Sequence, residues 1–334
     1  MFNNLKLSSI KIMLVGGLII FGLIFTLGIV NLITSSKILK NQSMISEFVI
    51  QKSPQQIPNH NQWIINAAQA KNLVIQGATI LDARSCKIFT TRSLSNATCI
   101  HWQEFSQSQL PFKGKLLTDD KVLTEKLQAI GIFNDKPVIV FGDTINGWGE
   151  DGRIVWMLRI LGHQKSFLVD GGFTALVKAG FPTVNFVNKS STIRGDFVVN
   201  RNKIWQISQN ELKANLDNNN LIIIDTRELQ EYSGKTPYGE TRGGHILGAI
   251  HIYFKDWLDK NGMLLSQDKI LEILANKGIT QGQTIITYCT GGVRSAWSSA
   301  VLVDLGFQVK NYSGSMWEWS ASNADIYPLD QFNY

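Results

Sequence analysis

Residues 221–227 read LIIIDTR, a short apolar run that ends in Asp-x-Arg, and residues 74–84 (VIQGATILDAR) end in the same way. A second apolar run follows each of them, at residues 137–141 (PVIVF) and 284–288 (TIITY). Short runs rich in Val and Ile are typical of strands that are buried on both faces of a sheet. The stretch LIIIDTR and its earlier counterpart therefore indicate two halves with the same plan.

The spacing between the two halves supports a domain duplication. Asp82 and Asp225 of the two Asp-x-Arg endings lie 143 positions apart. Leu161 and Leu305, which open the two later Leu-Gly pairs, lie 144 positions apart. Near-constant spacing over such a distance is the signature of an internal repeat. The chain is therefore predicted to contain two copies of one domain.

Longer amphipathic stretches separate the apolar runs. In residues 268–278 the apolar side chains fall on one helical face, and Gly278 is suited to end a helix. Strands that alternate with helices imply a mostly parallel sheet flanked by helices. We predict an α/β protein with tandem domains at residues 61–182 and 204–334, joined by a polar, strand-poor linker at 183–203.

The first 60 residues have a different composition. Residues 12–36 contain no charged side chain and are nearly all apolar, which matches the roughly 20 residues of a membrane-spanning helix. We predict a short flank at 1–11, one transmembrane anchor at 12–36 and a polar tether at 37–60, with the body outside the cytoplasm, in the periplasm of a Gram-negative host. A cleavable signal peptide is the alternative, although the run exceeds the usual ~7–15 residues and no Ala-x-Ala follows.

Charge and cysteine content exclude several classes of protein. The 32 Lys and Arg residues against 26 Asp and Glu give a net charge of +6, but they are scattered, which argues against a nucleic-acid partner. Three cysteines (Cys86, Cys99 and Cys289) are too few for a disulfide framework in 334 residues. No Cys-x-x-Cys or paired His spacing accompanies them, so no metal site is expected.

One of these cysteines stands where ligands bind in such folds. The strand at 284–288 delivers Cys289 to the carboxyl end of a parallel sheet. Gly291 and Gly292 follow and let the backbone curl, so that several N–H groups point inward. A helix is expected to start at Ser295, which places the sulfur near its N-terminus. These features stabilise an anion and lower a thiol pKa below its usual value of about 8.5.

Three segments of the chain resemble the rhodanese family. The loop CTGGVRS (289–295) is similar to the rhodanese active-site loop. Residues 242–250 (RGGHILGAI) are similar to the family's Gly-His-Ile-Pro-Gly-Ala segment, with Leu247 in place of the usual proline. Residues 312–319 (YSGSMWEW) resemble the Gly-Ser-x-x-Glu-Trp signature of two-domain sulfurtransferases. The resemblance covers roughly residues 60–330 and implies two tandem rhodanese-like domains, with no metal or organic cofactor.

The resemblance also implies that only the second domain is active. Gly142 stands where Cys289 stands in the second half, and the loop at 142–149 has no thiol. Tandem members of the family typically keep one inactive and one active domain. Cys86 and Cys99 match no family nucleophile, so they are interpreted as structural. The sequence leaves open whether these two cysteines pair.

The implied activity is transfer of a sulfane sulfur through a persulfide on Cys289. The donor would be thiosulfate or a related small anion, and the acceptor a thiol or cyanide. Four residues separate Cys289 from Arg294, whereas the related cysteine phosphatases have five, so phosphatase activity is disfavoured. Mercaptopyruvate sulfurtransferases are the rival enzyme class. They usually carry Cys-Gly-Ser-Gly-Val-Thr in the loop and an arginine where this chain has Glu231, and both departures favour thiosulfate or a protein persulfide as the donor. The sequence is also compatible with a persulfide carrier or with a non-catalytic, membrane-tethered binding module.

Residues around the loop have expected supporting roles. Arg242 is predicted to face the cleft and bind the anionic donor, with a surface arginine as the alternative. Asp225 and Arg227 are predicted to form a structural ion pair or a brace for the loop. His245 is predicted to brace the fold by hydrogen bonding, and the tryptophans of residues 317–319 to pack between the domains. The candidate site consists of Cys289 as the nucleophile and, as substrate-binding residues, Thr290, Gly291, Gly292, Val293, Arg294, Ser295 and Arg242.

Overall fold

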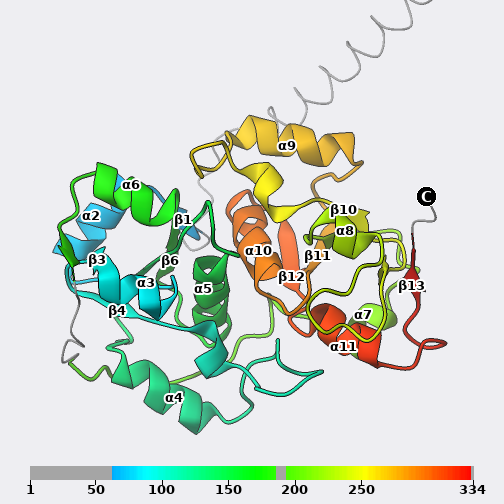
Figure 1. Ribbon diagram of the computed structural model, residues 1–334, viewed down its shortest axis with the longest axis horizontal. Coiled ribbons are helices and arrows are strands. Elements are labelled where there is room, and N and C mark those ends of the chain that lie inside the picture. Colours follow the sequence, from blue (N-terminus) through cyan, green and yellow to red (C-terminus); the bar gives the residue numbers. More distant parts are fainter. Residues whose placement is uncertain (1–61, 186–192, 332–334) are drawn as a thin grey trace, which may run out of the picture. The chain divides into compact units, whose positions relative to one another are not determined.

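The computed structural model describes residues 62–185 and 193–331 (Figure 1). The predicted flank, transmembrane anchor and tether of residues 1–60 lie outside this part of the chain. Among the described residues, no helix combines the length and the apolar character that crossing a bilayer requires.

The first half is an α/β unit in which strands and helices alternate along the chain. Its elements are β1 (Ile64–Ile65), α2 (Ala67–Ile75), β2 (Thr79–Asp82), α3 (Cys86–Thr91), β3 (Arg92–Leu94), β4 (Ala97–Cys99), the 3-10 helix η1 (Trp102–Phe105), α4 (Asp120–Ala129), β5 (Val138–Phe141), α5 (Glu150–Ile160), β6 (Ser166–Val169), α6 (Gly172–Lys178) and β7 (Thr183–Asn185). Five strands form a parallel sheet in the order β1-β6-β5-β2-β4.

The second half repeats this plan. Its elements are α7 (Gln209–Lys213), β8 (Leu221–Asp225), α8 (Leu229–Tyr232), β9 (His245–Ile246), β10 (Ile250–His251), the 3-10 helix η2 (Phe254–Trp257), α9 (Gln267–Asn276), β11 (Thr284–Tyr288), α10 (Arg294–Asp304), β12 (Gln308–Asn311), α11 (Ser315–Ala321) and β13 (Leu329–Asp330). Four strands form a parallel sheet in the order β10-β8-β11-β12.

The strand registers of the two sheets match. Asp82 at the end of β2 is paired with Phe141 of β5 and Cys99 of β4. Asp225 at the end of β8 is paired with Tyr288 of β11 and His251 of β10. The two Asp-x-Arg endings thus occupy the same place in their sheets, and the predicted pair of α/β halves with mostly parallel sheets is confirmed.

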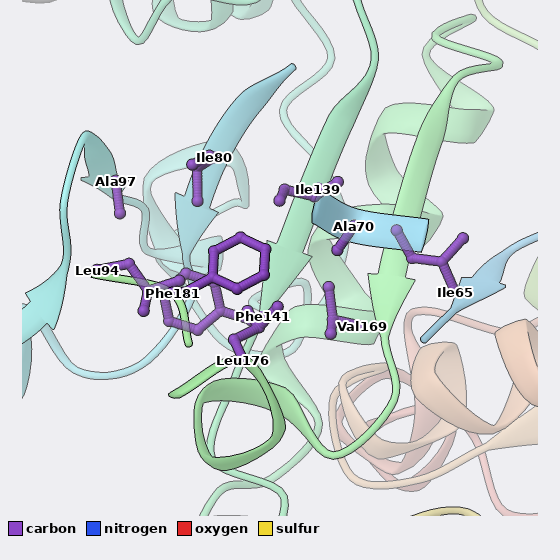
Figure 2. Close-up of a cluster of buried hydrophobic side chains, with 10 residues drawn as sticks. All are labelled: Ile65, Ala70, Ile80, Leu94, Ala97, Ile139, Phe141, Val169, Leu176 and Phe181. Atoms are coloured by element: carbon purple, nitrogen blue, oxygen red, sulfur yellow. The ribbon is translucent and has the colours of Figure 1, made fainter. Parts of the chain in front are cut away.

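A compact apolar cluster covers one face of the first sheet (Figure 2). Ile139 and Phe141 of β5 point into it, together with Ala70 of α2 and Leu176 of α6. Val138 and Val140 of β5 are also completely buried, and the alternation of side chains along a strand directs them to the opposite face. Burial on both faces explains why this strand is apolar without interruption. Each large aliphatic or aromatic side chain buried in this way contributes about 1.5–3 kcal/mol.

Two boundaries follow from the local backbone. Helix α9 ends where the sequence predicted, because Gly278 adopts φ +76°, a left-handed conformation that favours glycine, and its N–H donates to the Ala275 carbonyl. Strand β7 pairs antiparallel with β3. The first half therefore continues through Asn185, into the segment that the sequence assigned to the linker.

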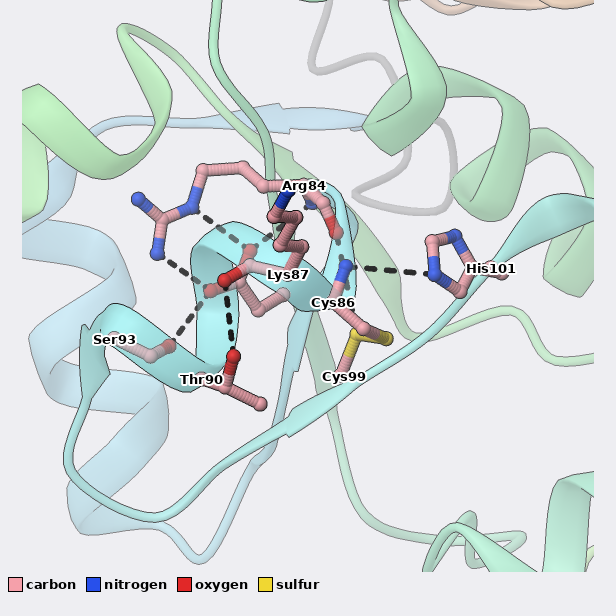
Figure 3. Close-up of a disulfide and its surroundings, with 8 residues drawn as sticks. Arg84, Cys86, Lys87, Thr90, Ser93, Cys99 and His101 are labelled. Carbon is pink, nitrogen blue, oxygen red and sulfur yellow. Dashed lines mark hydrogen bonds and ion pairs between the residues drawn. A yellow bond between two sulfur atoms is a disulfide. The ribbon is translucent and has the colours of Figure 1, made fainter. Parts of the chain in front are cut away.

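The two cysteines of the first half form a disulfide (Figure 3). Cys86 opens α3 and Cys99 ends β4, with their Cα atoms 5.8 Å apart. The backbone N–H of Cys86 also donates to Nε2 of His101 at 3.4 Å. The disulfide ties α3 to the edge strand of the sheet, which answers the question that the sequence left open about these residues.

Each Asp-x-Arg ending forms a buried ion pair, as predicted for Asp225 and Arg227. Arg227 binds the Asp225 carboxylate at 2.6 Å and also donates to the Gly244 carbonyl at 2.7 Å. Tyr288 donates its hydroxyl hydrogen to the same carboxylate at 2.6 Å. Burial alone would raise the pKa of Asp225, but the charge of Arg227 and these hydrogen bonds more than offset it, so that the pKa lies below its usual value.

We expect Asp225→Asn to lower the free energy of unfolding by about 3–5 kcal/mol, because it leaves Arg227 buried without its counter-charge. Urea unfolding of the full-length protein measures the change. In the wild type the contribution of the pair is present above the ordinary carboxyl pKa of about 3.9 and is lost as the pH falls below it.

Asp120→Asn is the matched control, because Asp120 pairs with Arg201 at 2.6 Å but its side chain is 50% exposed. Its cost should stay below about 1 kcal/mol. Equal costs for the two variants would contradict the structural role assigned to the buried pair.

Candidate functional site

Helices α5 and α10 lie side by side and bring the two halves together (Figure 1). Their close approach depends on glycine at two positions of the first half. A Cβ at Gly149 would lie 2.7 Å from Cβ of Trp297, and a Cβ at Gly152 would lie 2.6 Å from the same atom. The loop that follows β11 leads directly into α10, so it lies beside the first half.

The loop at residues 289–295, called the catalytic loop below after the role predicted for it, wraps its backbone around the Cys289 sulfur. Cys289 follows β11 and is only 1% exposed. The Gly292 N–H donates to Sγ at 3.1 Å, and the hydroxyl of Ser295 lies 3.6 Å from Sγ. Gly292 adopts φ +77°, and a Cβ there would lie 2.6 Å from the Ser313 carbonyl oxygen. The predicted cradle of amides around the sulfur is therefore present.

The surroundings of the sulfur favour the thiolate. Burial by itself would raise the pKa of Cys289, but the positive charge of Arg294 lowers it. Hydrogen bonds from the Ser295 backbone and side chain and from the Gly291 backbone lower it further. The net effect places the pKa of Cys289 below its usual value, so the sulfur ionises more readily than an ordinary thiol.

Arg294 does not point freely into solvent. It binds the buried Glu231 carboxylate through two hydrogen bonds, of 2.6 and 2.8 Å, and donates to the Thr290 hydroxyl at 2.7 Å. Thr290 in turn donates to Glu231 at 2.7 Å. The charge and the side chain of Arg294 are therefore held in a fixed, bidentate ion pair beneath the loop.

A cavity of about 230 Å³ opens onto Cys289. Its walls come from both halves of the chain and include four of the eleven lining residues as aromatic side chains. Trp148 of the first half and Tyr238 of the second meet edge to face, with ring centroids 5.5 Å apart. The lining residues are Trp102, Gln103, Trp148, Glu150, Tyr238, Cys289, Thr290, Gly291, Val293, Arg294 and Trp317. A reactant in this space would contact the sulfur and both domains at once.

The structure brings most of the sequence-predicted site residues together. Gly292 and Ser295 face the sulfur from the loop and the helix start, while the other four loop residues line the cavity. Arg242 does not join them. Its guanidinium donates to the carbonyls of Trp319, Ser320, Ser322 and Tyr327. These bonds anchor the carboxyl-terminal segment, so the placement of Arg242 does not support the predicted contact with a donor.

Two other sequence interpretations have clear outcomes. His245 is buried and braces the fold, since its Nδ1 lies 3.0 Å from the Tyr232 carbonyl and its ring stacks on Tyr232. The prediction of interdomain packing is wrong for Trp319, which lies in the apolar core of the second half. Trp317 does contact the first half, because the Lys113 ammonium lies 5.4 Å from its ring centroid, and it also lines the cavity.

The corresponding loop of the first half has no space for a cysteine side chain at Gly142. A Cβ at Gly142 would lie 2.6 Å from Oδ2 of Asp151. Asp151 precedes Ser295 by the same 144 positions that separate Leu161 from Leu305. Burial raises the pKa of Asp151 to about 7, and its Oδ2 has no hydrogen-bond partner in the described part of the chain. A carboxyl group thus fills the space next to the missing nucleophile.

One group of potential metal ligands occurs among residues 62–185 and 193–331. It consists of Cys86, Cys99 and His101, whose ligand atoms lie within 4.8 Å of one another. The two sulfurs are joined in the disulfide, whereas zinc binds cysteine as the thiolate. In this oxidised form the group has no thiolate to offer a metal.

Sequence reasoning missed several residues of the site. The sequence pattern marks Glu231 as a departure from mercaptopyruvate sulfurtransferases but does not predict its pairing with Arg294. A buried arginine next to the nucleophile requires a counter-charge, and that requirement could have pointed to an acidic partner. The cavity walls contributed by Trp102, Trp148 and Tyr238 carry no sequence signal, because only the docking of the two halves brings them together.

Sequence comparisons identify relatives along both halves. The rhodanese-like domain family matches residues 65–179 and 208–322. Thiosulfate sulfurtransferase of Rattus norvegicus is 25% identical over 238 residues, which cover 70% of this chain and 79% of the relative. A sulfur carrier protein of Thermus thermophilus is 27% identical over 243 residues, which cover 70% of this chain and 84% of the carrier.

A solved structure shares the fold. The 3-mercaptopyruvate sulfurtransferase from Leishmania major superimposes with a TM-score of 0.66 at 20% identity. The match covers 79% of this chain and 76% of that enzyme. At this level of identity the likeness concerns the arrangement of the two halves only.

We expect Ser295→Ala to raise the pKa of Cys289 by about half a unit to one unit, the value of one hydrogen bond to the thiolate. The thiolate would then form at higher pH, so the midpoint of alkylation by iodoacetamide would move in the alkaline direction. Ser298→Ala is the control, because Ser298 is buried in the same helix and its hydroxyl has no partner among the described atoms. A shift of equal size in both variants would refute the role of Ser295.

Proposed function

Since the chain belongs to the rhodanese-like family, we propose that it is a sulfurtransferase that takes sulfane sulfur from thiosulfate through a persulfide on Cys289. The observation that carries the proposal is the buried Cys289 sulfur with a lowered pKa, held by loop amides at the inner end of a cavity. With Cys86 and Cys99 joined, Cys289 is also the one free thiol of the chain's three cysteines.

The proposed reaction is a double displacement. In the first step the Cys289 thiolate attacks the outer sulfur of thiosulfate, a new sulfur–sulfur bond forms, and sulfite leaves with the electron pair of the old bond. In the second step a thiol or cyanide attacks the outer sulfur of the persulfide, and the Cys289 thiolate is released. The loop amides can stabilise Cys289 in both of its anionic forms, the thiolate and the persulfide.

The fixed ion pair of Arg294 supports thiosulfate over 3-mercaptopyruvate as the donor. Recognition of a substrate carboxylate is strongest when an arginine offers its planar fork. The fork of Arg294 is already occupied by Glu231, which stands where mercaptopyruvate sulfurtransferases carry an arginine. Thiosulfate does not need this fork, because its charge can be met by backbone N–H groups of the loop.

The membrane anchor at residues 12–36 is part of the proposal, with the body outside the cytoplasm. The apolar, uncharged character of these residues supports it. The Cys86–Cys99 disulfide supports an oxidising compartment, because disulfides persist there and are rare in the cytosol.

We expect the full-length protein, expressed in a Gram-negative host, to stay in the membrane pellet after an alkaline wash and to be degraded by external protease in spheroplasts. A cleaved signal peptide would instead yield a soluble protein whose mass lacks the first residues. Resistance to the protease in intact spheroplasts, with degradation only after lysis, would contradict the proposed side of the membrane.

We expect thiocyanate to form from thiosulfate and cyanide, and Cys289→Ser to abolish this reaction while leaving the thermal unfolding temperature nearly unchanged. Lys71→Ala is the control, because it changes only an exposed helix residue and should keep full activity. Gly142→Ala is not suitable, because Asp151 fills the space beside Gly142.

Faster turnover with 3-mercaptopyruvate than with thiosulfate would keep the proposed mechanism and overturn the proposed donor. Formation of a Cys289 persulfide without turnover would favour a sulfur carrier, the role named for the Thermus thermophilus relative.

A further inference from the structure

A buried arginine of the first half lies against the catalytic loop of the second. Arg153 belongs to α5 and is completely buried. Its guanidinium donates to the Gly292 carbonyl at 3.3 Å and to the Gly114 carbonyl at 2.7 Å. It also donates to the Ser106 hydroxyl at 3.2 Å, while Nε has no partner among the described atoms.

Arg153 differs from the other buried arginines near the Asp-x-Arg endings and the loop. Arg84, Arg227 and Arg294 each form an ion pair with a carboxylate at 2.6 to 2.7 Å. Arg153 has no carboxylate within 4.0 Å in the described part of the chain, and its hydrogen-bond partners are carbonyls and one hydroxyl. Its guanidinium also lies over the rings of Trp156 and Trp102, 4.8 and 5.7 Å from their centroids, and these contacts carry no negative charge. An unpaired cation in the protein interior is unfavourable unless an anion lies nearby.

The negative charge that acts on Arg153 is that of the Cys289 thiolate, whose loop it contacts through the Gly292 carbonyl. Burial lowers the pKa of Arg153 to about 10, and the negative charge of Cys289 is the influence that acts in the opposite direction. Arg294 is the stronger single influence on the pKa of Cys289, but Glu231 binds its guanidinium through two hydrogen bonds and offsets much of its field. Arg153 is therefore the arginine beside the loop whose positive charge no carboxylate neutralises.

We propose that Arg153 is a positioning residue that supplies the counter-charge for the Cys289 thiolate and persulfide from the inactive domain. It acts through the loop, because it holds the carbonyl of Gly292, whose own N–H points at the sulfur. The proposal rests on the proposed function only for the persulfide; the effect on the thiolate is independent of any sulfur donor.

Three glycines allow the first half to reach the loop. A Cβ at Gly114 would lie 2.6 Å from the Gly291 carbonyl oxygen, so this segment packs directly against the catalytic loop. Gly149 and Gly152 let α5 approach Trp297 of α10 closely enough for Arg153, the residue after Gly152, to reach the Gly292 carbonyl. The close packing at these three glycines thus places the Arg153 side chain of the first half next to the catalytic loop.

The test is the pH dependence of iodoacetamide alkylation of the full-length protein, which has Cys289 as its single thiol when the disulfide is intact. We expect Arg153→Met to raise the pKa of Cys289 by about one unit, the effect of removing one nearby charge. The alkylation rate at neutral pH should fall several-fold and recover at alkaline pH. Arg153→Lys keeps the charge and should restore most of the wild-type profile.

Arg159→Met is the matched control. Arg159 lies on the same helix, is equally buried, and binds the carbonyls of Ser166 and Gln62 away from the loop. Its removal should destabilise the protein without moving the pKa of Cys289. A wild-type pKa in folded Arg153→Met, or an equal shift in Arg159→Met, would overturn the proposal.

A second pair of variants decides the matter if Arg153→Met does not fold. Ser106→Asp places a carboxylate beside the Arg153 guanidinium and neutralises it in place, whereas Ser106→Asn adds a similar volume without charge. We expect the aspartate variant alone to raise the pKa of Cys289. Identical alkylation profiles for these two variants would show that Arg153 is only a structural brace.

Turnover of thiosulfate, measured in the same preparations, separates this proposal from the proposed function. Alkylation needs no sulfur donor, so the expected pattern of pKa shifts can hold in a protein that turns over neither donor. That outcome would refute the enzymatic function and keep the role of Arg153. Normal turnover with unshifted pKa values would do the reverse.

Discussion

A thiolate at Cys289 has to be stabilised in a place that bulk water does not reach, and the residues around it are arranged to do so. Cys289 is almost completely buried, and burial opposes ionisation. The hydration free energy that the buried thiolate lacks must be replaced by interactions with fixed dipoles and charges of the protein. The curled loop, the start of α10 and the positive side chains next to them all serve this one requirement.

The ion pairs around the loop give these groups fixed positions. Glu231 holds Arg294 and Thr290 beneath the loop. One strand away, Asp225 binds Arg227 and Tyr288, the residue that immediately precedes the nucleophile. Removing one member of either set would leave a buried charge without a partner, which is more costly than the pair is favourable. The chemistry of the loop and the stability of the second half therefore depend on the same side chains.

The two halves show how one scaffold supports opposite electrostatics. In the second half a hydroxyl, Ser295, lies beside the sulfur, whereas in the first half a carboxyl, Asp151, fills the space beside Gly142. A carboxylate at that distance would repel a thiolate, so the first half could not act by regaining a cysteine alone. It contributes instead Trp102 and Trp148 to the cavity walls and a close contact with the loop at residues 289–295.

The two α/β halves, the strand ends marked by Asp82 and Asp225, and the position of Cys289 in a glycine loop before a helix could all be predicted from the amino-acid sequence. They follow from local patterns: apolar runs of strand length, a repeated spacing, and glycines after a cysteine. The partner of Arg294, the displacement of Arg242 to the carboxyl-terminal segment, the disulfide, and the approach of Arg153 to the loop emerge only in the folded chain. These depend on contacts between residues 13 to 139 positions apart, which no local pattern encodes. The first three arise from the folding of one half, and the last arises from the docking of α5 on α10.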